Sequence, residues 1–517
     1  MLSGLQPALR SKDLPKIFKV GTRGSLLALT QCQQIVNTLS EKTGASFELD
    51  IIKTQGDLNT SIPLWQMEGQ NFFTKELDQA LIEKRVDLVV HSYKDLGSTR
   101  PPEIEIAAIT KRKYSQDILL IKKETIKNLK NIETFTVGTS SPRRIANTTF
   151  HLKDYLPGIK SIKTETLRGN VNTRIGKLQS GEYQAIVLAL AGIERLALSE
   201  KSKLELVPLL KGLNFMVLPL ANFPSSASQG ALAIEVLKEN TELKDRLKVV
   251  NDEDTTQEIK RERKTFNEYG GGCHLAVGIN VKKSGPFYLH VHQGEFEGKR
   301  VDLKKLERTD DITIPKGMPC FIGMQQGDQN EVVYDRLILK RPLTPTIKNR
   351  AHFYITSAHC LDALEQVYDG GSIWAAGNKT MKGLIQKGYW VQGCADSLGD
   401  EVIKELKDSK VIQMMLEDLS WKVLTNDESK SEIGEIISSY TREIKEADKN
   451  ILNCQAFFWT SFFQYQQYTL KFPEIKDRHH ACGLGKTLQQ FNDEGIKVVP
   501  FSGFREFLNY MKDEDRG

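Results

Sequence analysis

The sequence LVVHSYKD, residues 88–95, decides how the first part of the chain is expected to fold. It opens with three apolar residues without a break, which is typical of a strand buried on both faces. Polar and charged residues follow at once, and in open α/β sheets ligands bind beyond the carboxyl ends of the strands. The stretch therefore predicts a core strand of an α/β sheet, with Lys94 and Asp95 at its functional edge. The alternative is a solvated Lys-Asp surface pair.

Strand-like and helix-like patterns alternate on both sides of this stretch. Strands are expected at 18–20 and 47–52, and Ser25 is expected to cap a helix between them. Phe73 and the apolar residues after it mark a further helix. Strands separated by helices predict a largely parallel sheet with helices packed on it.

The next hundred residues repeat this alternation. Strands are expected at 134–137 and 185–190, and helices near Pro142 and Val171. A segment rich in Gly, Pro and Ser then leads to an apolar run at 231–234, which we expect to cross back and complete the first domain.

The chain of 517 residues is too long for one core and predicts three or four domains. We expect α/β domains throughout, with a smaller α+β unit third. The predicted boundaries are 17–112 plus 216–240 for the first domain, 113–215 for the second, 241–340 for the third and 341–517 for the last.

A weak internal repeat divides the last domain. A Thr-Ser pair at 356–357 precedes the turn AGNKT, and a second pair at 460–461 precedes GLGKT. In each copy a further glycine lies eight residues after the threonine of the turn. The repeat predicts two α/β lobes facing each other, and chance similarity between two α/β units is the alternative.

Arginines recur where an expected strand gives way to an expected helix. The planar guanidinium group matches a carboxylate with two hydrogen bonds, so converging arginines predict a ligand with many carboxylates. Two of them lie in the first turn of a helix, where the dipole disfavours cations, so we expect a bound anion to offset them. The alternative is an ordinary serine cap with solvated arginines. The six arginines are Arg23, Arg143, Arg144, Arg168, Arg174 and Arg195.

The stretch EYGGGCH, residues 268–274, places Cys273 after three glycines. Glycine accepts backbone angles that other residues refuse, so the thiol is expected on an adaptable loop. With Lys94 and the arginines, this predicts an enzyme that carries a covalent group on Cys273 and handles a polyanion. A helix C-cap beside a buried small thiol is the alternative. The polar segment 54–71, which contains Asp57, is either a mobile lid or a plain surface loop.

Composition indicates which cellular compartment and which classes of partner to expect. Seven scattered cysteines without a CxxC pair indicate free thiols in a reducing compartment and argue against a disulfide framework or zinc site. The formal net charge of +5 is small, and no basic run suggests nucleic acid. No apolar window predicts a signal peptide or membrane span, so we expect a cytoplasmic protein.

In this order, the motifs resemble the hydroxymethylbilane synthase family, also called porphobilinogen deaminase, over residues 17–280. The resemblance implies two lobes like those of periplasmic binding proteins and a third domain that carries a dipyrromethane cofactor on Cys273. The implied reaction condenses four porphobilinogen molecules head to tail, with loss of ammonia, into a linear tetrapyrrole. The carrying motifs are GTRGS (21–25), FTKEL (73–77), HSYKD (91–95), GTSSPRR (138–144), LRGN (167–170), residues 188–195, QGA (229–231) and GGC (271–273).

The resemblance also implies roles for single residues. Asp95 matches the catalytic aspartate. Cofactor contacts are implied for Lys94, Ser141, Arg143, Arg144 and Asp57, besides Cys273. Substrate contacts are implied for Arg23, Ser25, Arg168, Arg174, Arg195 and Phe73. The chain departs from the family at Gln116, Ser228 and Leu96-Gly97, which puts local contacts in doubt, and residues 281–345 match the third domain poorly.

The tail, 341–517, is similar to uroporphyrinogen III synthase, a two-lobed α/β family that cyclises the same linear product. Tyr440 loosely matches a tyrosine implicated there. The alternatives are an inactive scaffold, or a whole chain that is a two-lobed polyanion-binding module. The expected partners are porphobilinogen and the linear tetrapyrrole; a monomer without metal, nucleic acid or membrane is expected.

Overall fold

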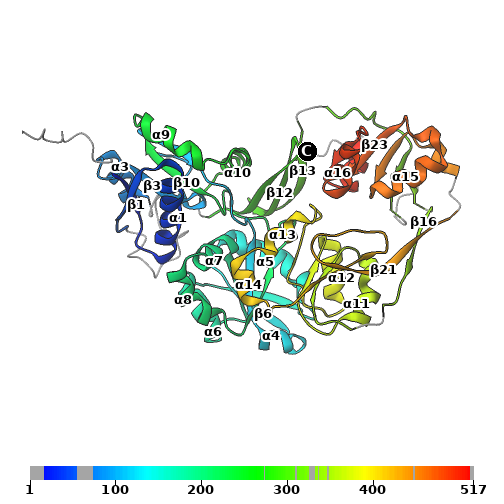
Figure 1. The fold of residues 1–517 in the computed structure, drawn as a ribbon, viewed down its shortest axis with the longest axis horizontal. Coiled ribbons are helices and arrows are strands. Elements are labelled where there is room, and N and C mark those ends of the chain that lie inside the picture. Colours follow the sequence, from blue (N-terminus) through cyan, green and yellow to red (C-terminus); the bar gives the residue numbers. More distant parts are fainter. Residues whose placement is uncertain are drawn as a thin grey trace, which may run out of the picture.

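The computed structural model describes residues 17–54, 74–272, 274–308, 311–324, 332–335, 337–345, 348–445 and 449–512. Asp57, Phe73 and Cys273 are outside these ranges. The domains follow one another along an elongated molecule, from the blue N-terminal domain at one end to the orange and red tail at the other (Figure 1). The predicted α/β class is confirmed, because helices and strands alternate in all but the third domain.

The first domain has a five-stranded sheet in the order β2-β1-β3-β10-β4. Strand β1 pairs in parallel with β2 and β3, whereas β10 is antiparallel to β3 and β4. The sheet is thus mixed rather than largely parallel, because β10 returns from the second domain. The elements are β1 (Ile17–Thr22), α1 (Leu26–Thr43), β2 (Ser46–Ile51), α3 (Lys75–Ile82), β3 (Leu88–Ser92), β4 (Ile104–Ile109), β10 (Leu232–Leu237) and α9 (Thr241–Leu247).

Local sequence sets both limits of α1, and its start at Ser25 is as predicted. Ser25 accepts a hydrogen bond from the backbone N–H of Ala28 at 3.3 Å, and Gly44 ends the helix in the left-handed region at φ 68°. The face that carries Cys32 and Leu39 is buried against the sheet. The cap and the apolar spacing together determine this helix.

The second domain repeats the topology, in the order β7-β6-β8-β5-β9. Here β6 is parallel to β7 and β8, and β5 is antiparallel to β8 and β9. In each domain the fourth place is filled by the strand that comes directly after the chain crosses between the domains, β10 in the first and β5 in the second. The elements are β5 (Asp117–Lys122), α4 (Lys123–Lys127), β6 (Thr134–Gly138), α5 (Pro142–His151), β7 (Ser161–Glu165), α6 (Val171–Gln179), β8 (Ala185–Ala189), α7 (Leu190–Ala197), α8 (Glu200–Leu210) and β9 (Leu213–Val217).

The third domain is one helix on an antiparallel three-stranded sheet. Helix α10 (Glu253–Glu268) precedes β11 (Ala276–Ser284), β12 (Phe287–Phe296) and β13 (Lys299–Glu307). Glu262 of α10 ties the domains together, because its carboxylate accepts from Arg112, from the Ser228 N–H at 2.7 Å and from the Val281 N–H at 2.9 Å. A fully buried carboxylate with this many donors is well satisfied.

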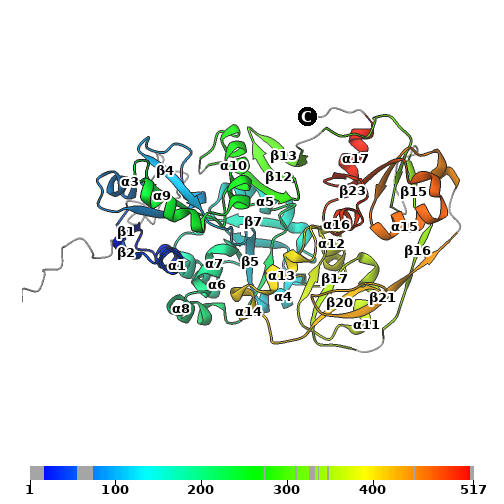
Figure 2. The ribbon, with the colours of Figure 1, turned by 45° about the horizontal axis from the view of Figure 1, so that its top comes forward.

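The tail has two lobes, drawn in yellow to red in Figures 1 and 2. We call residues 337–345 and 348–445 the docking lobe, because this lobe packs against the second domain. Its sheet order is β16-β21-β20-β17-β18-β19. The elements are β16 (Ile338–Pro342), β17 (His352–Ile355), α11 (Leu361–Val367), β18 (Ile373–Ala375), α12 (Asn378–Gln386), β19 (Gly393–Cys394), α13 (Glu401–Lys407), α14 (Lys410–Met415), β20 (Trp421–Asn426) and β21 (Glu435–Ile444).

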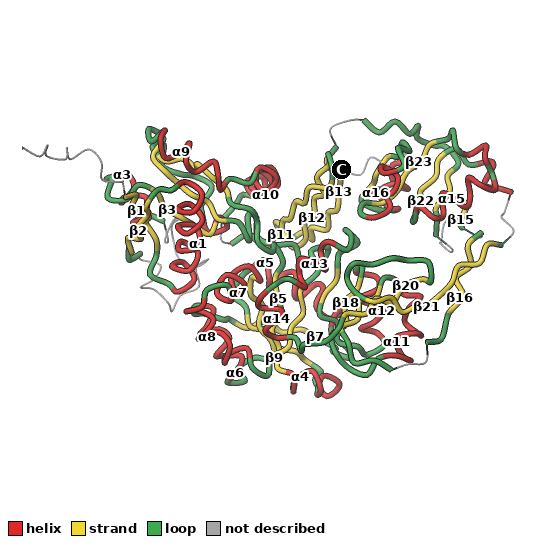
Figure 3. Tube along the Cα trace, in the orientation of Figure 1, coloured by secondary structure: helices red, strands yellow, loops and turns green. Residues whose placement is uncertain are grey.

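The outer lobe combines residues 449–512 with the preceding segments 311–324 and 332–335. Its sheet order is β15-β14-β22-β23-β24, and β15, β22 and β23 are labelled at the upper right of Figure 3. The elements are β14 (Cys320–Ile322), β15 (Val332–Tyr334), β22 (Ala456–Trp459), α15 (Phe462–Lys471), β23 (His479–Gly483), α16 (Lys486–Asp493), β24 (Val499–Phe501) and α17 (Phe504–Met511).

The outer lobe corrects the predicted boundary at 340/341. Strand β14 pairs in parallel with β22, with Cys320 opposite Ala456, so these residues belong to the tail and not to the third domain. Two strands of three residues carry too short a pattern to show which distant strand they join.

The predicted repeat is present in both lobes as strand, helix, strand, helix. It comprises β17, α11, β18 and α12 in one lobe and β22, α15, β23 and α16 in the other. The Thr-Ser pairs have a capping role, since Ser357 accepts from the His359 N–H and Ser461 from the Gln464 N–H, both at 3.3 Å. The sequence motif therefore marks equivalent turns.

Candidate functional site

The predicted edge lies where β3 ends. Lys94 and Asp95 belong to a short 3-10 turn, Tyr93–Asp95, directly after that strand. Asp95 is exposed, whereas Lys94 is partly buried and its Nζ lies 3.4 Å from Oε1 of Gln229. The Lys94 ammonium is thus not a solvated surface charge.

The surroundings of Lys94 disfavour its charged form. Burial, and then the guanidinium groups of Arg144 and Arg143, lower the pKa of Lys94 to about 8 against the opposing effect of Asp95. Asp117 also acts on this ammonium, so charged residues from both domains surround Lys94 at a common site. A negatively charged ligand would further favour the protonated lysine.

Arg143 and Arg144 are paired in a way that sequence reasoning missed. Both lie in the first turn of α5 and both bind the buried carboxylate of Asp117: Oδ2 accepts from Nη1 of Arg143 at 2.9 Å and from Nε of Arg144 at 3.0 Å. Burial alone would raise the pKa of Asp117, but the two arginines hold it well below its usual range. The expected bound anion is therefore not needed to explain their placement, which corrects that expectation.

Gln229 joins this pair to the first domain. Its Nε2 donates to Oδ1 of Asp117 at 3.0 Å while its Oε1 faces Lys94. The next residue must be glycine, because Gly230 has φ 91° and an added Cβ would lie 2.0 Å from the carbonyl oxygen of Lys113. The return segment thus bridges the two domains at the site.

Three further arginines carry less compensated charge. Burial, then Arg144 and Arg168, lower the pKa of Arg174 to about 10, and burial lowers the pKa of Arg195 to about 10. Nε of Arg168 is buried, and no described residue accepts a hydrogen bond from it. Cations that are buried, as Arg195 is, or half-buried, as Arg168 and Arg174 are, favour an anionic ligand, so the residues fit a group that bears several carboxylates.

Arg174 and Arg195 are each oriented by a backbone carbonyl. Nε of Arg174 donates to Gly169 O at 2.8 Å, and Nη2 of Arg195 donates to Gly230 O at 2.6 Å. These bonds leave the remaining guanidinium N–H groups for a ligand.

The hydroxyl groups of Ser25 and Ser141 act as helix caps. Ser25 caps α1, and Ser141 accepts from the Arg144 N–H at 3.5 Å at the start of α5. Arg23 is half-buried at the end of β1, on the same edge of the sheet as Lys94. Their contacts with substrate or cofactor remain predictions.

The loop before Cys273 has the predicted conformation. Helix α10 ends at Glu268, and Gly270, Gly271 and Gly272 have φ of 80°, 62° and 89°. Residues with a side chain rarely adopt this region, so the three glycines are required by the backbone. Cys273, Asp57 and Phe73 themselves are outside the described residues.

A second buried cluster under the site consists of Asp78, His91 and Glu235, which have the spacing of metal ligands. Arg100 already contacts the first and last of these carboxylates, at 2.5 and 2.6 Å. The cluster is thus an ion-pair network between α3, β3 and β10, in which Arg100 supplies the cation.

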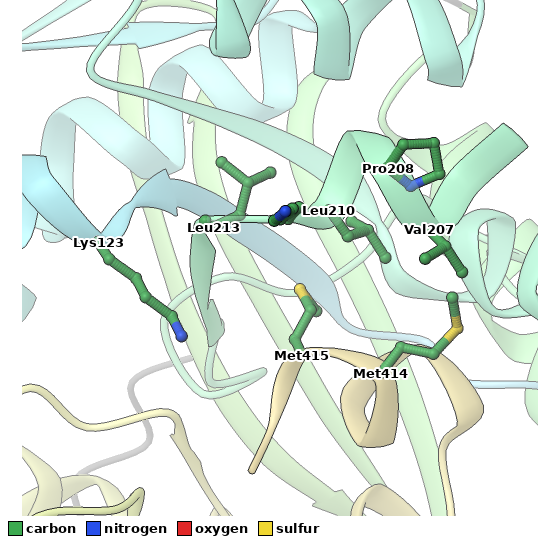
Figure 4. A pocket seen from close by; sticks show the side chains of 9 residues that line it. Lys123, Val207, Pro208, Leu210, Leu213, Met414 and Met415 are labelled. Atoms are coloured by element: carbon green, nitrogen blue, oxygen red, sulfur yellow. The ribbon is translucent and has the colours of Figure 1, made fainter.

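Two cavities lie away from this site. One of about 430 Å³ lies between the second domain and α14, with Met414 and Met415 facing Val207 and Leu213 (Figure 4). Its lining contains no residue that the sequence assigned to the site.

Comparison with known proteins places this geometry in a family. Residues 18–245 match the family model described as "Porphobilinogen deaminase, dipyromethane cofactor binding domain". Porphobilinogen deaminase of Maridesulfovibrio salexigens is 38% identical over 260 residues, which are 50% of this chain and 78% of that protein. The Helicobacter hepaticus enzyme is 36% identical over 269 residues, which are 51% of this chain and 76% of that protein.

The fold defines an α/β protein in which cationic residues of the first two domains line a common site. The chain belongs to the porphobilinogen deaminase family, whose matched domain binds the dipyrromethane cofactor. Among solved structures, uroporphyrinogen-III synthetase of Helicobacter pylori matches at 13% identity and a TM-score of 0.27, covering 36% of this chain and 93% of that one. None of the helices in the described ranges is both long and apolar enough to cross a bilayer.

Proposed function

We propose that the chain is a hydroxymethylbilane synthase, which joins four porphobilinogen molecules head to tail and releases ammonia at each condensation. The observation that carries the proposal is the set of incompletely offset cations around Asp95, within a chain of this family. Each pyrrole of the product bears two carboxylates, so a growing chain needs many guanidinium partners.

The cofactor supplies a covalently held primer to which substrate units are added. We propose that Cys273 carries it through a thioether. Lys94, Ser141, Arg143 and Arg144 hold its carboxylates, and Asp57 is a further cofactor-binding residue. Because Asp117 offsets only one of the two arginine charges, this group of residues keeps a net positive charge toward an acidic ligand.

Asp95 is the proposed catalytic group. Its exposed carboxylate lies within electrostatic range of Lys94 and Arg174, and a carboxylate in this position can accept a proton from a bound substrate. The same charge stabilises the positive charge that develops on porphobilinogen as ammonia leaves. Arg23, Ser25, Phe73, Arg168, Arg174 and Arg195 are the proposed substrate-binding residues, and each charged hydrogen bond contributes about 1.5–3 kcal/mol.

The test combines intact mass with turnover. Purified protein should carry the mass of two pyrrole units, Cys273→Ser should lose it, and Asp95→Asn should bind porphobilinogen while kcat falls about 10²–10⁴-fold. Cys32→Ser is the matched control, since Cys32 is buried in α1 and its pKa is raised to about 12 by burial. An unmodified mass in protein that binds porphobilinogen without consuming it would instead identify a polyanion-binding module.

A second activity is proposed for the tail: ring closure of the linear product to uroporphyrinogen III. The supporting observation is a basic cluster around Tyr440 in the docking lobe. Nζ of Lys340 lies 5.8 Å from the Tyr440 ring centroid, and the His359 ring lies 5.7 Å from it. Burial lowers the pKa of Lys340, and Arg442 and Lys379 lower it further. Cations that crowd one tyrosine would suit a ligand with many carboxylates.

Product analysis tests this second activity. The full-length protein fed with porphobilinogen should yield mainly the type III ring, and Tyr440→Phe should shift the product toward type I. Tyr368→Phe is the control, because its hydroxyl donates to Gly371 O elsewhere in the same lobe. If the wild-type chain gives type I alone, the tail is a scaffold. A cytoplasmic monomer without nucleic-acid or membrane partners remains our prediction.

A further inference from the structure

The docking lobe is joined to the second domain as if the two were one domain. The edge strand β9 meets β19, the edge strand of the docking lobe: the Val217 N–H donates to Gln392 O at 2.7 Å, and Nε1 of Trp390 donates to Phe215 O at 2.9 Å. An added Cβ on Gly393 would lie 3.1 Å from Cβ of Val217. Each lobe therefore covers an edge that would otherwise be open to pairing with another chain.

Apolar packing at this boundary resembles a domain core. Phe215 and Trp374 are fully buried with their rings 5.9 Å apart, and Ile412 of α14 belongs to the same buried cluster. Interfaces between domains of one chain are ordinarily more polar and allow relative motion. This lobe is thus held in a fixed orientation on the second domain.

A single buried carboxylate connects the lobe to the site. Glu194 of α7 is 3% exposed, and its partners all come from the start of α14. Oε2 accepts from Oγ of Ser409 at 2.7 Å and from the Val411 N–H at 3.1 Å, and Oε1 accepts from the Lys410 N–H at 3.1 Å. A carboxylate at a helix N-terminus is favourable, and without these donors a buried Glu194 would be unpaired.

Helix α7 is also fixed by the first domain. The carbonyl oxygen of Arg195 accepts from Nε2 of Gln34 in α1 at 3.2 Å, while the Arg195 guanidinium donates to Gly230 O. Two neighbouring residues of one short helix therefore connect the docking lobe, the first domain and the return segment. Figures 1 and 2 show α14 beside the second domain, on the side where α7 and α8 lie.

We propose that the docking lobe is a positioning element of the deaminase site: through Glu194, helix α14 fixes α7 and so aims Arg195 at a carboxylate of the substrate. The inference rests on the proposed function for the role of Arg195. Glu194 does not touch the substrate and is a positioning residue. In this chain the tail thus contributes to substrate binding by the deaminase, whether or not the tail has an activity of its own.

The test uses the full-length holoenzyme with Glu194→Gln and Ser409→Ala. The glutamine keeps the length of the side chain but turns an NH₂ group toward backbone donors, and the alanine removes one of three donors. We expect the KM for porphobilinogen to rise about three- to tenfold in Glu194→Gln, and less in Ser409→Ala, with kcat within about twofold of wild type. Glu200→Gln, an exposed glutamate at the start of the next helix, should match wild type.

Hydrogen exchange provides a readout that does not depend on turnover. Amides of α7 should exchange faster in both variants than in wild type and in Glu200→Gln. An unchanged KM together with unchanged exchange in α7, while α14 exchanges faster, would overturn the proposal and leave the contact purely structural. A wild-type chain that does not consume porphobilinogen would contradict the proposed function instead, and the exchange of α7 would then decide the coupling by itself. If Glu194→Gln does not fold, Ser409→Ala decides both readouts.

Discussion

Arg143 and Arg144 differ from Arg174 and Arg195 in how their charge is offset, although all four follow the same sequence pattern. The first pair shares the buried carboxylate of Asp117. The second pair donates to backbone carbonyls, and burial lowers the pKa of each to about 10. The comparison shows that arginines at strand-to-helix junctions differ in how much of their charge a buried carboxylate offsets: about half for the first pair, and none for the second.

The largest effect is expected from removing the shared carboxylate. Asp117→Asn leaves two buried guanidinium groups without a counter-charge, so the free energy of unfolding should fall by about 3–5 kcal/mol. Urea denaturation measures it, with Glu133→Gln as control, because the Glu133–Lys160 pair is exposed and should contribute at most about 1 kcal/mol. Equal stabilities for the two variants would contradict the role of Asp117 as the counter-charge of Arg143 and Arg144.

A smaller effect is expected from Arg195→Met, and it should fall on substrate binding rather than on stability. The substitution removes a buried charge that is only partly satisfied, so stability should change little or rise. The KM for porphobilinogen should rise about tenfold, which corresponds to about 1.4 kcal/mol. Steady-state kinetics measure the change in KM, and thermal unfolding measures the change in stability. A loss of stability as large as that of Asp117→Asn, with an unchanged KM, would place Arg195 among the structural arginines.

The smallest effect is expected in how the free energy of unfolding depends on pH. The pKa of Lys94 is lowered from 10.5 to about 8, so between these values the unfolded chain binds more protons than the folded chain. The free energy of unfolding should therefore rise with pH from about 8 to 10.5 relative to Lys94→Met, and the penalty should be complete below pH 8. Urea titrations of Cys273→Ser and of Cys273→Ser/Lys94→Met would show it. Parallel pH profiles for the two variants would mean that folding does not lower the pKa of Lys94.

Local sequence predicted the helices and the residues at their ends. Ser25, Pro142 and Val171 stand where α1, α5 and α6 begin, because capping and apolar spacing are properties of neighbouring residues. The repeat in the tail was found for the same reason. Asp117 left a weak signal, a charged residue directly before four apolar ones at the start of a buried strand, but nothing local identified its partners.

The sequence by itself determined the strand-and-helix alternation, the family, and the residues available for an acidic substrate, since short motifs carry that information. Only the tertiary structure decided which charges meet: Asp117 with two arginines, and Glu194 with α14, which follows it in the chain by more than two hundred residues. It also assigned β14 and β15 to the tail. The physical reason is that ion pairs, strand partners and shared cores depend on distance in space, which sequence separation does not encode.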